Sequence, residues 1–600
     1  MRSCSGGSTS SFLLRKKEGR KIKMALLSLA LGSLILSLVY LAVRHVLPHP
    51  ANPRANFPPG PPALPFLGNL HQIQLTKPFL QFAEWGRTHG AHGLVGLRLG
   101  PSSRAVVVNS WRAARDLLDR RGAVYSSRPY VPIVEYVVPP PGDIHLVFMP
   151  YGPKWRKARR TVTDFLRDDE VDRLVPLQDA ESSQMMHDLL LLSAPAPSPA
   201  PSPAPAPAPA PAPGQYHDHV LRCFGAVVMT SVFGTRGRDF GDEGRIRQFF
   251  DCQAEWAGML DQGAVPPFDV FPFLRHVPDV LTPWRGWRRR AAALKSKQNG
   301  LYRDLFREAR ARVERQGKAG GSFVASLLRN NARDGYSEVE LEYITGFLME
   351  GGSDTTAGAF ETFVLAMAAY QEVQRRAQAE VDSVFGEDGV RSGQAGADAL
   401  PYLKACFLET LRWRPGFPLA IPHATTQDDI YQGYHIPANT TILMNIWAIS
   451  HDPDEYEDPD SFRPERFLDG EFGTASGSRE EPNETAEGGP GDQTDSQSQS
   501  QSQSQSRRPT YGFGAGRRVC AGQRMAENSM LMTMSKLLWY FDVVVPGGRA
   551  PDTGVRTAFK DAILTGPKPF DVGFDVRGER RRGVLVDEWA KADAWLRQFE

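Results

Sequence analysis

Residues 511–530, YGFGAGRRVCAGQRMAENSM, constrain this chain most, because they place one cysteine in a glycine-rich turn directly before an apolar helix pattern. Glycines let a backbone bend tightly and approach a bulky, flat ligand. The start of a helix and nearby cations stabilise a thiolate, the form of cysteine that binds metals. Val519 stands where a dinucleotide-binding loop would need its third glycine. Cys520 is therefore a candidate metal ligand.

The charge and the other cysteines exclude several classes of protein. The formal net charge is only +2 over 600 residues, so nothing electrostatic favours a nucleic-acid binder. The remaining cysteines are scattered and form no C-x-x-C pair; they are Cys4, Cys223, Cys252 and Cys406. We expect neither a disulfide framework nor a structural zinc site, but a reducing compartment and one functional thiol.

Residues 24–43 form an uncharged apolar run, MALLSLALGSLILSLVYLAV. This length is sufficient for a helix to cross a hydrocarbon core of about 30 Å. We predict a single transmembrane anchor over residues 24–47. A cleaved signal peptide is the main alternative, and a buried helix is the other. No small-x-small cleavage site follows the run, which favours the anchor.

The orientation of the anchor depends on residues 1–23, a basic extension. Its cations would hold the N-terminus in the cytosol and send the main domain to the lumen. If translation starts at Met24, these cations are absent and Arg44 is the main positive charge beside the span. The positive-inside rule then keeps the main domain in the cytosol. We interpret residues 1–23 as an extension outside the native start. The expectation is a single-pass membrane protein whose main domain is cytosolic.

Three segments of biased composition organise the rest of the chain. Residues 48–69 are rich in proline and predict a stiff hinge after the anchor. Residues 194–214 are mostly an Ala-Pro repeat, and residues 472–508 are rich in Gly, Ser, Gln and acidic residues. Neither tract can build a core, so we predict two disordered insertions. One large domain remains, over residues 70–600.

Most of this domain has a helical pattern. Residues 337–370 form the longest predicted helix, with Ser337 and Glu340 as a capping box at its start. Another predicted helix covers residues 400–413. Strand-like pieces lie at residues 104–109 and 440–445. The fold class is therefore mainly α with a minor β part.

The cysteine segment carries a family resemblance. Five of its positions match the pattern F-x-x-G-x-R-x-C-x-G; they are Phe513, Gly516, Arg518, Cys520 and Gly522. With this pattern the chain resembles the cytochrome P-450 family. The sequence RWRPGFPLAIPHATT, residues 412–426, resembles fungal microsomal members of that family. The resemblance implies a P-450-type helical fold that binds heme b (iron protoporphyrin IX). It also implies that Cys520 is the axial iron ligand, Phe513 packs beside the thiolate, Arg518 pairs with a propionate and Gly522 belongs to the cofactor-binding turn.

A second window resembles the family's supporting network. Glu409 and Arg412 stand three positions apart, so they share a helical face. They look like the family's E-x-x-R pair. Residues 462–467, FRPERF, resemble the motif whose arginine joins that pair, here Arg466. The resemblance implies a buried network of three charges that supports the ligand loop.

Two further windows resemble propionate-binding positions. Trp155 and Arg159 match the W-x-x-x-R helix of the family, at a spacing that puts both on one face. His423 lies where the family often places another propionate donor. A lone histidine is more often a satisfied structural residue, which is the alternative here.

Residues 351–356, GGSDTT, match the family's central-helix motif. Glycines and small polar residues weaken a helix at mid-length, and the hydroxyl of Thr355 can bond back to the carbonyl of Gly351. This opens a groove for dioxygen and water. The resemblance implies that Asp354 and Thr355 deliver protons during the reaction. A kink without chemistry is the alternative.

The implied activity is that of a monooxygenase, which inserts one oxygen atom from O2 into a lipophilic molecule. Its electrons come from NADPH through a separate membrane-bound flavoprotein reductase, since the chain shows no flavin or nicotinamide module. Residues 131–148, 347–351, 417–421 and 561–565 are the expected pocket lining, and a role in secondary metabolism is a hint from the fungal resemblance. A heme-thiolate isomerase, dehydratase or peroxygenase, an inactive heme sensor and a tethered scaffold are the alternatives. Residues 577–600 have no clear counterpart in the family.

Overall fold

The computed structural model describes residues 56–193, 215–238, 240–241, 244–316, 321–387, 389, 399–474 and 507–600, with isolated positions at 32, 33 and 37. Apart from those positions, the predicted anchor over residues 24–47 lies outside the described residues, as do the Ala-Pro tract and residues 475–506. Within the described ranges, no helix is long and apolar enough to cross a membrane.

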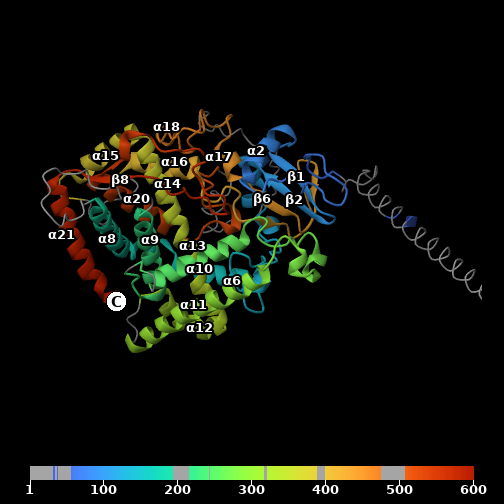
Figure 1. Cartoon of the computed structure of the whole chain (residues 1–600), viewed down its shortest axis with the longest axis horizontal. Coiled ribbons are helices and arrows are strands. Elements are labelled where there is room, and N and C mark those ends of the chain that lie inside the picture. Colours follow the sequence, from blue (N-terminus) through green and yellow to red (C-terminus); the bar gives the residue numbers. More distant parts are fainter. Residues whose placement is uncertain are drawn as a thin grey trace, which may run out of the picture.

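Helices form most of the molecule, and a smaller part carries the main sheet (Figure 1). The longer helices are α2 (Pro78–Thr88), α6 (Pro153–Phe165), α8 (Val175–Ser193), α9 (Gln215–Phe233), α10 (Arg245–Leu260), α11 (Trp287–Gln316), α12 (Phe323–Asp334), α13 (Glu338–Gly352), α14 (Asp354–Ala369), α15 (Gln371–Phe385), α16 (Pro401–Trp413), α20 (Gln523–Tyr540) and α21 (Glu579–Leu596). The shorter ones are α3 (Trp111–Ala114), η2 (Arg115–Arg120), α4 (Gly122–Tyr125), α5 (Val134–Val137), α7 (Asp168–Asp172), η3 (Pro272–His276), η4 (Asp279–Leu281), α17 (Ile446–Ser450), α18 (Arg466–Asp469), η6 (Gly516–Arg518), η7 (Pro546–Gly548) and η8 (Arg597–Phe599). The predicted class, mainly α with a minor β part, is confirmed.

The main sheet has the strand order β1-β2-β6-β3. Strands β1 and β2 are antiparallel, β2 and β6 are parallel, and β3 closes the sheet antiparallel to β6. The two predicted strands are β2 and β6, which lie side by side although over 300 residues separate them. The strands are β1 (Leu94–Leu99), β2 (Ser103–Val108), β3 (His423–Ala424), β4 (Asp429–Tyr431), β5 (Tyr434–Ile436), β6 (Thr441–Met444), β7 (Phe541–Val544) and β8 (Gly573–Val576).

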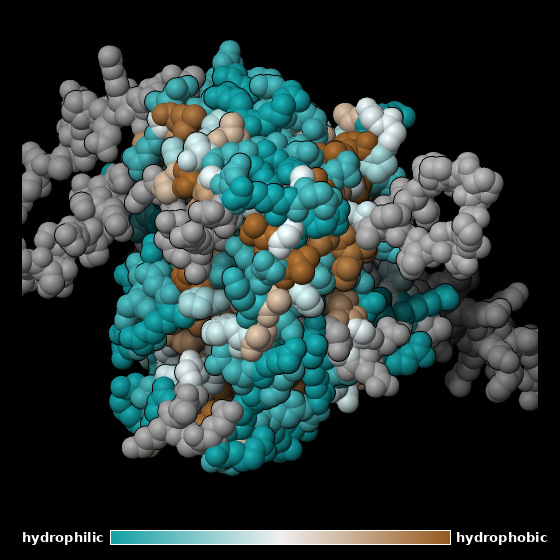
Figure 2. Space-filling model, turned by 90° about the vertical axis from the view of Figure 1, so that its left-hand side faces the viewer, coloured by the Kyte–Doolittle hydropathy of each residue, from teal (hydrophilic) through white to brown (hydrophobic). Residues whose placement is uncertain are grey.

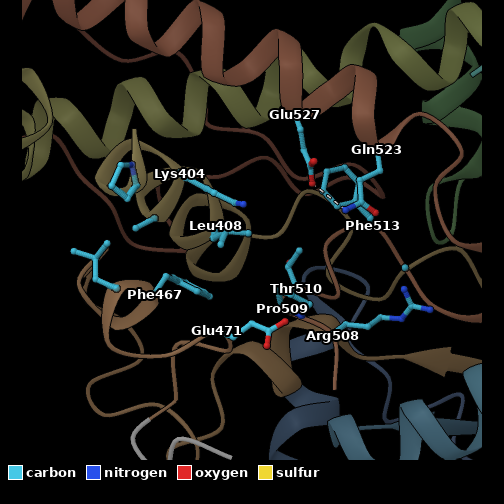
Figure 3. Close-up of a pocket in the computed structure, with 14 residues that line it drawn as sticks. Lys404, Leu408, Phe467, Glu471, Arg508, Pro509, Thr510, Phe513, Gln523 and Glu527 are labelled. Atoms are coloured by element: carbon cyan, nitrogen blue, oxygen red, sulfur yellow. Dashed lines mark hydrogen bonds between the residues drawn. The ribbon is translucent and has the colours of Figure 1, made fainter. Parts of the chain in front are cut away.

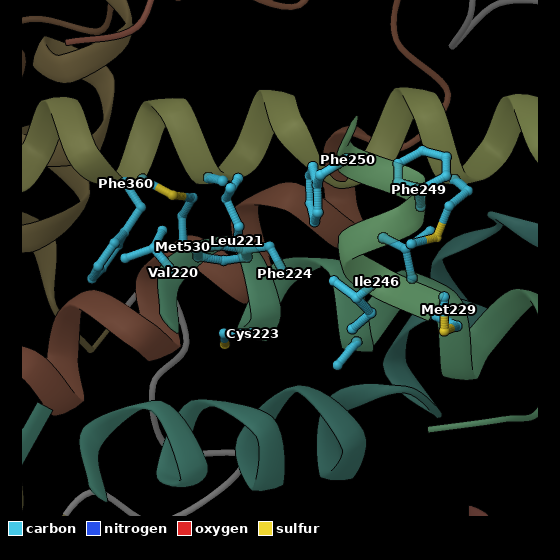
Figure 4. Packing of buried hydrophobic residues seen from close by; sticks show 14 of the residues in the cluster. Val220, Leu221, Cys223, Phe224, Met229, Ile246, Phe249, Phe250, Phe360 and Met530 are labelled. Carbon is cyan, nitrogen blue, oxygen red and sulfur yellow. The ribbon is translucent and has the colours of Figure 1, made fainter. Parts of the chain in front are cut away.

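Helix α9 runs through the centre of the helical core. Every residue from Val220 to Phe233 is buried, as expected of a helix enclosed by other helices. It contacts α8, α13 and α14, and its Phe224 ring lies 5.7 Å from the ring of Phe360 on α14. Figure 4 shows the side chains of Phe224 and Phe360 within this packing. This packing holds α13 and α14 over the site described below.

Residues 337–370 form two helices, where we predicted one. The predicted capping box of Ser337 and Glu340 is present at the start of α13. The helix then breaks at Ser353, and α14 begins at the next residue. The hydroxyls of Ser353 and Thr355 donate to the carbonyls of Met349 and Gly351 at 2.8 and 2.9 Å. Such back-bonding competes with the helical ladder and bends a helix, so it accounts for the break.

The C-terminal end of the predicted insertion over residues 472–508 is anchored to the domain. Arg507 is buried and donates to Glu455 at 2.6 Å. Arg508 donates to Asp119 at 2.6 Å. These two contacts hold the start of the segment that leads into the ligand loop.

The C-terminal segment, for which we found no family counterpart, is packed into the fold. Helix α21 lies along α8 at the edge of the helical part (Figure 1). Its Leu585 and Leu596 are buried, and η8 follows it. Figure 2 shows this side of the molecule, where hydrophilic residues cover most of the surface and apolar patches are small.

Candidate active site

A cavity of about 420 Å³ lies in the helical core, between α6, α10, α13, α14 and the segment that precedes α20. It brings together nine of the side chains that we singled out from the sequence: Trp155, Arg159, Asp354, Thr355, His423, Phe513, Arg518, Cys520 and Gly522. They come from four separate stretches of the chain. Part of each predicted pocket segment also lines the cavity.

The loop that carries Cys520 is fixed at both of its bends. The Cys520 N–H donates to the carbonyl of Phe513 at 2.9 Å, which closes the loop. Gly516 has a φ of +64°, and a Cβ there would lie 2.1 Å from the carbonyl oxygen of Leu118. Its N–H donates to Asp119 at 2.7 Å. Only glycine fits at position 516, because both the conformation and the close approach exclude a side chain.

Cys520 faces the interior of the protein. Its accessible surface opens onto the cavity, although protein surrounds the residue on all sides. Burial raises the pKa of Cys520, while the N–H of Gly522 and the Arg159 guanidinium act in the opposite direction. A thiolate therefore needs a bound cation to be favoured here, and a metal ion that coordinates a thiol deprotonates it.

The other described cysteines are structural. Cys223, Cys252 and Cys406 are free and buried. Burial raises the pKa of Cys223 and of Cys252 to about 12. Burial also raises the pKa of Cys406 well above its usual range. Such thiols are inert, so Cys520 is the best metal-ligand candidate among the described cysteines.

Three half-buried arginines face the cavity without an acidic partner among the described residues. They are Arg128, Arg159 and Arg518, and their guanidinium groups donate to backbone carbonyls alone, namely those of Val147, Ile421, Pro422, Val519, Ser126, Leu146 and Met149. Burial lowers the pKa of Arg128 to about 9 and of Arg518 to about 8, and also lowers that of Arg159. Unpaired buried cations are unfavourable unless an anion binds between them. Two propionates beside a thiol-bound iron fit this arrangement.

Trp155 orients one of these arginines. The Arg518 guanidinium lies over the Trp155 ring, 4.2 Å from its centroid. Trp155 and Arg159 share the helix α6, as their spacing predicted. The stack fixes the plane of the guanidinium before an anion arrives.

His423 lies beside the same arginines, with a defined proton position. Its Nδ1 is 2.8 Å from the carbonyl oxygen of Tyr125, so Nδ1 carries the proton. Burial and the nearby Arg128 lower the pKa of His423 to about 3. In this neutral form Nε2 has no proton to donate. A propionate therefore bonds to His423 only if it also brings the ring to its imidazolium form.

Asp354 and Thr355 lie at the break between α13 and α14. The predicted hydrogen bond from the Thr355 hydroxyl to the Gly351 carbonyl is present at 2.9 Å. Burial raises the pKa of Asp354, and Lys560 and His217 oppose this shift. His217 bonds to Glu361, two turns along α14 from Asp354. These groups form a polar strip beside the groove.

The predicted charge network lies behind the ligand loop and outside the cavity lining. Glu409 and Arg412 on α16 form a two-fold hydrogen bond at 2.6 and 2.8 Å. Arg466 donates to the same carboxylate at 3.3 Å. All three side chains are buried. Arg412 also donates to the carbonyl of Ser450 at 2.8 Å, which ties α16 to α17.

A second cavity, of about 650 Å³, lies on the other side of Phe513 (Figure 3). Lys404, Phe467, Arg508, Gln523 and Glu527 are among its lining residues. Cys520 is not among them. It is larger, but no cysteine is among its lining residues, and its Arg508 is already paired with Asp119.

Sequence reasoning missed three polar side chains in the first cavity. Arg128 is one of the unpaired arginines, and His145 and Glu350 face each other at 3.0 Å. His145 and Glu350 fall within or beside predicted lining segments, yet no motif marks them. Only the folded chain shows that they are buried together.

A mainly helical fold whose cavity joins one thiol to unpaired arginines is that of a heme-thiolate protein. The sequence model of the cytochrome P450 family matches residues 58–574. The chain therefore belongs to the cytochrome P450 family and is an oxidoreductase of the monooxygenase type. The resemblance drawn from the sequence is confirmed.

Fungal cytochrome P450 monooxygenases are similar to the chain over almost its whole length. One from Arthrobotrys oligospora is 31% identical over 94% of this chain and 97% of its own. One from Armillaria gallica is 33% identical over 91% of this chain and 94% of its own. The monooxygenase fogE of Aspergillus ruber is 32% identical over 89% of this chain and 90% of its own.

Proposed function

We propose that this cytochrome P450 inserts one oxygen atom from O2 into a lipophilic small molecule. Heme b is held by the Cys520 thiolate, and electrons come from NADPH through a separate flavoprotein reductase. The observation that carries this proposal is the cavity itself. One thiol, three half-buried arginines without an acidic partner among the described residues, and the Thr355 groove surround a single space.

When bound, a heme with a thiolate ligand supplies oxygen activation and O–O cleavage. The residues of this chain hold it and set its surroundings. Cys520 provides the iron ligand, and Phe513 shields one side of the sulfur. Arg128, Arg159 and Arg518 neutralise the propionates with charge-assisted hydrogen bonds. Glu409, Arg412 and Arg466 keep the ligand loop in position from outside.

Proton delivery falls to Asp354 and Thr355. The Thr355 hydroxyl is held by the Gly351 carbonyl, so its oxygen lies at the break in the helix and faces the cavity. Burial raises the pKa of Asp354, so its carboxyl group holds a proton more readily than an exposed one, can donate it towards the cavity, and is then protonated again. His217 is about a third exposed and bonds to the buried Glu361, so it connects this region to solvent. An isomerase or dehydratase would need no such strip.

The substrate is lipophilic because most of the cavity wall opposite the arginines is apolar. Phe148, Phe224, Trp256, Leu260 and Phe347 line it. Burial of an apolar ligand there gains about 25 cal/mol for each square ångström removed from water.

The reductase docks on the cationic surface of α6. Arg156 and Arg160 are exposed on this helix, and Trp155 and Arg159, each one position earlier, face the cavity. Lys157 is half-buried at the edge of this surface, and the nearby Lys154 is paired with Asp143. A cationic face speeds association with an acidic partner. Electrons would then enter beside the propionate-binding arginines.

Membrane attachment is part of the proposal. Exposed apolar residues gather on two segments, residues 64–75 and 273–281; they are Leu64, Phe66, Leu67, Leu75, Phe273 and Leu281. The two segments lie close together, because the ring of Phe66 is 5.6 Å from that of Phe271, two residues before the second segment. Exposed apolar patches mark surfaces that bind membranes or partners. With the predicted anchor over residues 24–47, this surface holds a cytosolic domain against the endoplasmic reticulum membrane.

The reduced, carbon monoxide-bound absorption spectrum tests the ligand. We expect the red-shifted Soret band of thiolate ligation in the wild type and its loss in Cys520→Ala. An unchanged spectrum in the variant would overturn the ligand assignment. Incubation with NADPH, a reductase and a panel of lipophilic compounds tests turnover. Heme binding without any substrate-dependent NADPH consumption would favour a sensor over an enzyme.

A further inference from the structure

A loop formed by residues 558–568 reaches the cavity that holds Cys520. Backbone hydrogen bonds join its two arms, one of them from the N–H of Lys568 to the carbonyl of Ala558 at 2.7 Å. Ile563 and Leu564 lie at the tip of the loop and line the cavity. The tip forms bends rather than a helix or strand, so contacts with other segments have to fix its position.

Lys77 holds one arm of this loop from a segment 482 positions away in the sequence. Its ammonium group donates to the carbonyls of Phe559 and Lys560 at 3.0 and 3.5 Å, and to the carboxylate of Asp561. The Lys77 side chain is only 4% exposed. A buried donor that loses its acceptors costs about 1–3 kcal/mol, so these bonds oppose any withdrawal of the loop.

Asp261 holds the tip itself. It follows the last residue of α10, a helix that lines the cavity, and its carboxylate accepts the N–H of Ile563 at 3.1 Å. Two positions further along the loop, the N–H of Thr565 donates to the carbonyl of Gly416 at 2.7 Å. The tip is therefore tied to two other walls of the cavity, while Lys77 ties the arm behind it.

We propose that Lys77 and Asp261 are positioning residues that limit the size of the substrate by keeping Ile563 and Leu564 in the cavity. Neither Lys77 nor Asp261 is among the residues that line the cavity, so both act through the loop. This deepens the proposed function and rests on it, because the same cavity holds the substrate. The substrate class is a compact lipophilic molecule, since a bulky one fits only when the tip withdraws.

Two iron-binding probes of different size test this limit in the holoenzyme. Imidazole and clotrimazole share an azole ring whose nitrogen binds heme iron and shifts the Soret band, and clotrimazole also carries a chlorinated triphenylmethyl group. The ratio of their two Kd values therefore reports the room in the cavity. We expect Lys77→Met to shift this ratio at least fivefold in favour of clotrimazole, with the Kd of imidazole within twofold of the wild-type value. The φ of +48° at position 77 is equally unfavourable for lysine and methionine, so only the donors are lost.

Substitutions of Asp261 test the bond to the tip. Asp261→Ala removes the acceptor of the Ile563 N–H and should shift the ratio at least threefold in favour of clotrimazole. Asp261→Asn keeps an oxygen that accepts this N–H, so its ratio should stay within twofold of the wild-type value. Lys568→Met is the matched control for Lys77→Met, because the exposed Lys568 donates to the carbonyl of Thr557 at 2.8 Å in the same part of the chain. Its ratio should also stay within twofold.

A merely structural role for Lys77 would lower the midpoint of thermal unfolding and leave the ratio unchanged. A shift below fivefold, a shift in favour of imidazole, no binding of clotrimazole to Lys77→Met, or an equal shift in Lys568→Met would each overturn the proposal. If Lys77→Met does not fold, a shift below threefold in Asp261→Ala overturns it.

The imidazole titration separates this proposal from the proposed function. If imidazole produces no Soret shift in the wild type, the heme site is overturned, and the size limit falls with it. If imidazole shifts the band in the wild type and in Lys77→Met while the ratio stays the same, only the role of Lys77 and Asp261 is overturned.

Discussion

Glu409 accepts two hydrogen bonds from Arg412 across one turn of α16, at 2.6 and 2.8 Å, and both side chains are almost fully buried. Removing one member of such a pair leaves an uncompensated buried charge. We predict that Glu409→Gln lowers the free energy of unfolding by about 3–5 kcal/mol. Denaturant unfolding followed by Soret absorbance measures both stability and heme release.

The pair formed by Glu372 and Arg375 on α15 is the control. It has a similar three-residue spacing and lies at 2.5 Å, but both side chains are exposed. Glu372→Gln should change the free energy of unfolding by about 0.5 kcal/mol or less. Equal effects of the two substitutions would contradict a special role for burial at Glu409.

Asp354→Asn should stabilise the protein and impair turnover. Burial raises the pKa of Asp354, so the folded state favours its neutral form. In the unfolded chain the carboxyl ionises near about pH 3.9. In the wild type, the contribution of Asp354 to stability is therefore fully present below that pH. It is lost as the pH rises through the pKa that Asp354 has in the folded protein. The neutral amide avoids this loss.

The predicted gain of Asp354→Asn therefore grows as the pH rises above about 4. At neutral pH we expect the midpoint of thermal unfolding to rise by about 2 °C or more, the change that corresponds to about 1 kcal/mol in a large domain. Product formed per NADPH consumed should fall. Asp304→Asn, on an exposed position of α11, is the control and should change neither quantity. A gain that shrinks with rising pH would contradict the sign.

Arg128→Met should weaken heme binding more than it weakens the fold. The half-buried Arg128 donates only to carbonyls among the described residues, so its charge lacks a counterion until a propionate binds. A charge-assisted hydrogen bond is worth about 1.5–3 kcal/mol, so heme affinity should fall by about 10- to 100-fold. Transfer of heme to apomyoglobin measures this. Arg156→Met, on the exposed face of α6, should transfer heme at the wild-type rate.

Arg236 is predicted to be essential for stability. Its guanidinium is fully buried and pairs with Glu181 at 3.1 Å, Asp593 at 3.4 Å and Glu600 at 3.2 Å. Arg236→Met should lower the free energy of unfolding by about 3–5 kcal/mol, because it leaves Glu181 short of a partner. Arg238 contacts the same Glu600 from an exposed position. Arg238→Met should cost about 0.5 kcal/mol or less, and a similar loss in both variants would speak against the prediction.

The sequence predicted the local features of the site because local patterns carry them. The capping box at Ser337 and the hydroxyl bond of Thr355 both join residues within four positions. Such contacts follow from helical spacing alone. The cysteine motif also fixed the positions of Phe513, Arg518 and Gly522, since all of them lie within one loop.

Contacts between distant segments were not predictable in this way. His145 and Glu350 are 205 positions apart, and no pattern along the chain signals that each is buried against the other. Arg128 bonds to carbonyls nearly 300 positions away. The break at Ser353 was indicated by composition, but the division into two helices depends on where the hydroxyls bond.

The close approach of Gly516 to the carbonyl of Leu118 makes the ligand loop and the η2 segment a single interlocking unit. If the loop alone were replaced by that of a relative, the new loop would have to pack on the η2 segment of this chain at the closest contact between them. Chimeras between this enzyme and its relatives should therefore keep residues 115–122 and 508–522 from the same parent. A crossover between these two blocks would take the two contacting segments from different parents. The close contact between them would then be lost, even if each segment kept its own conformation.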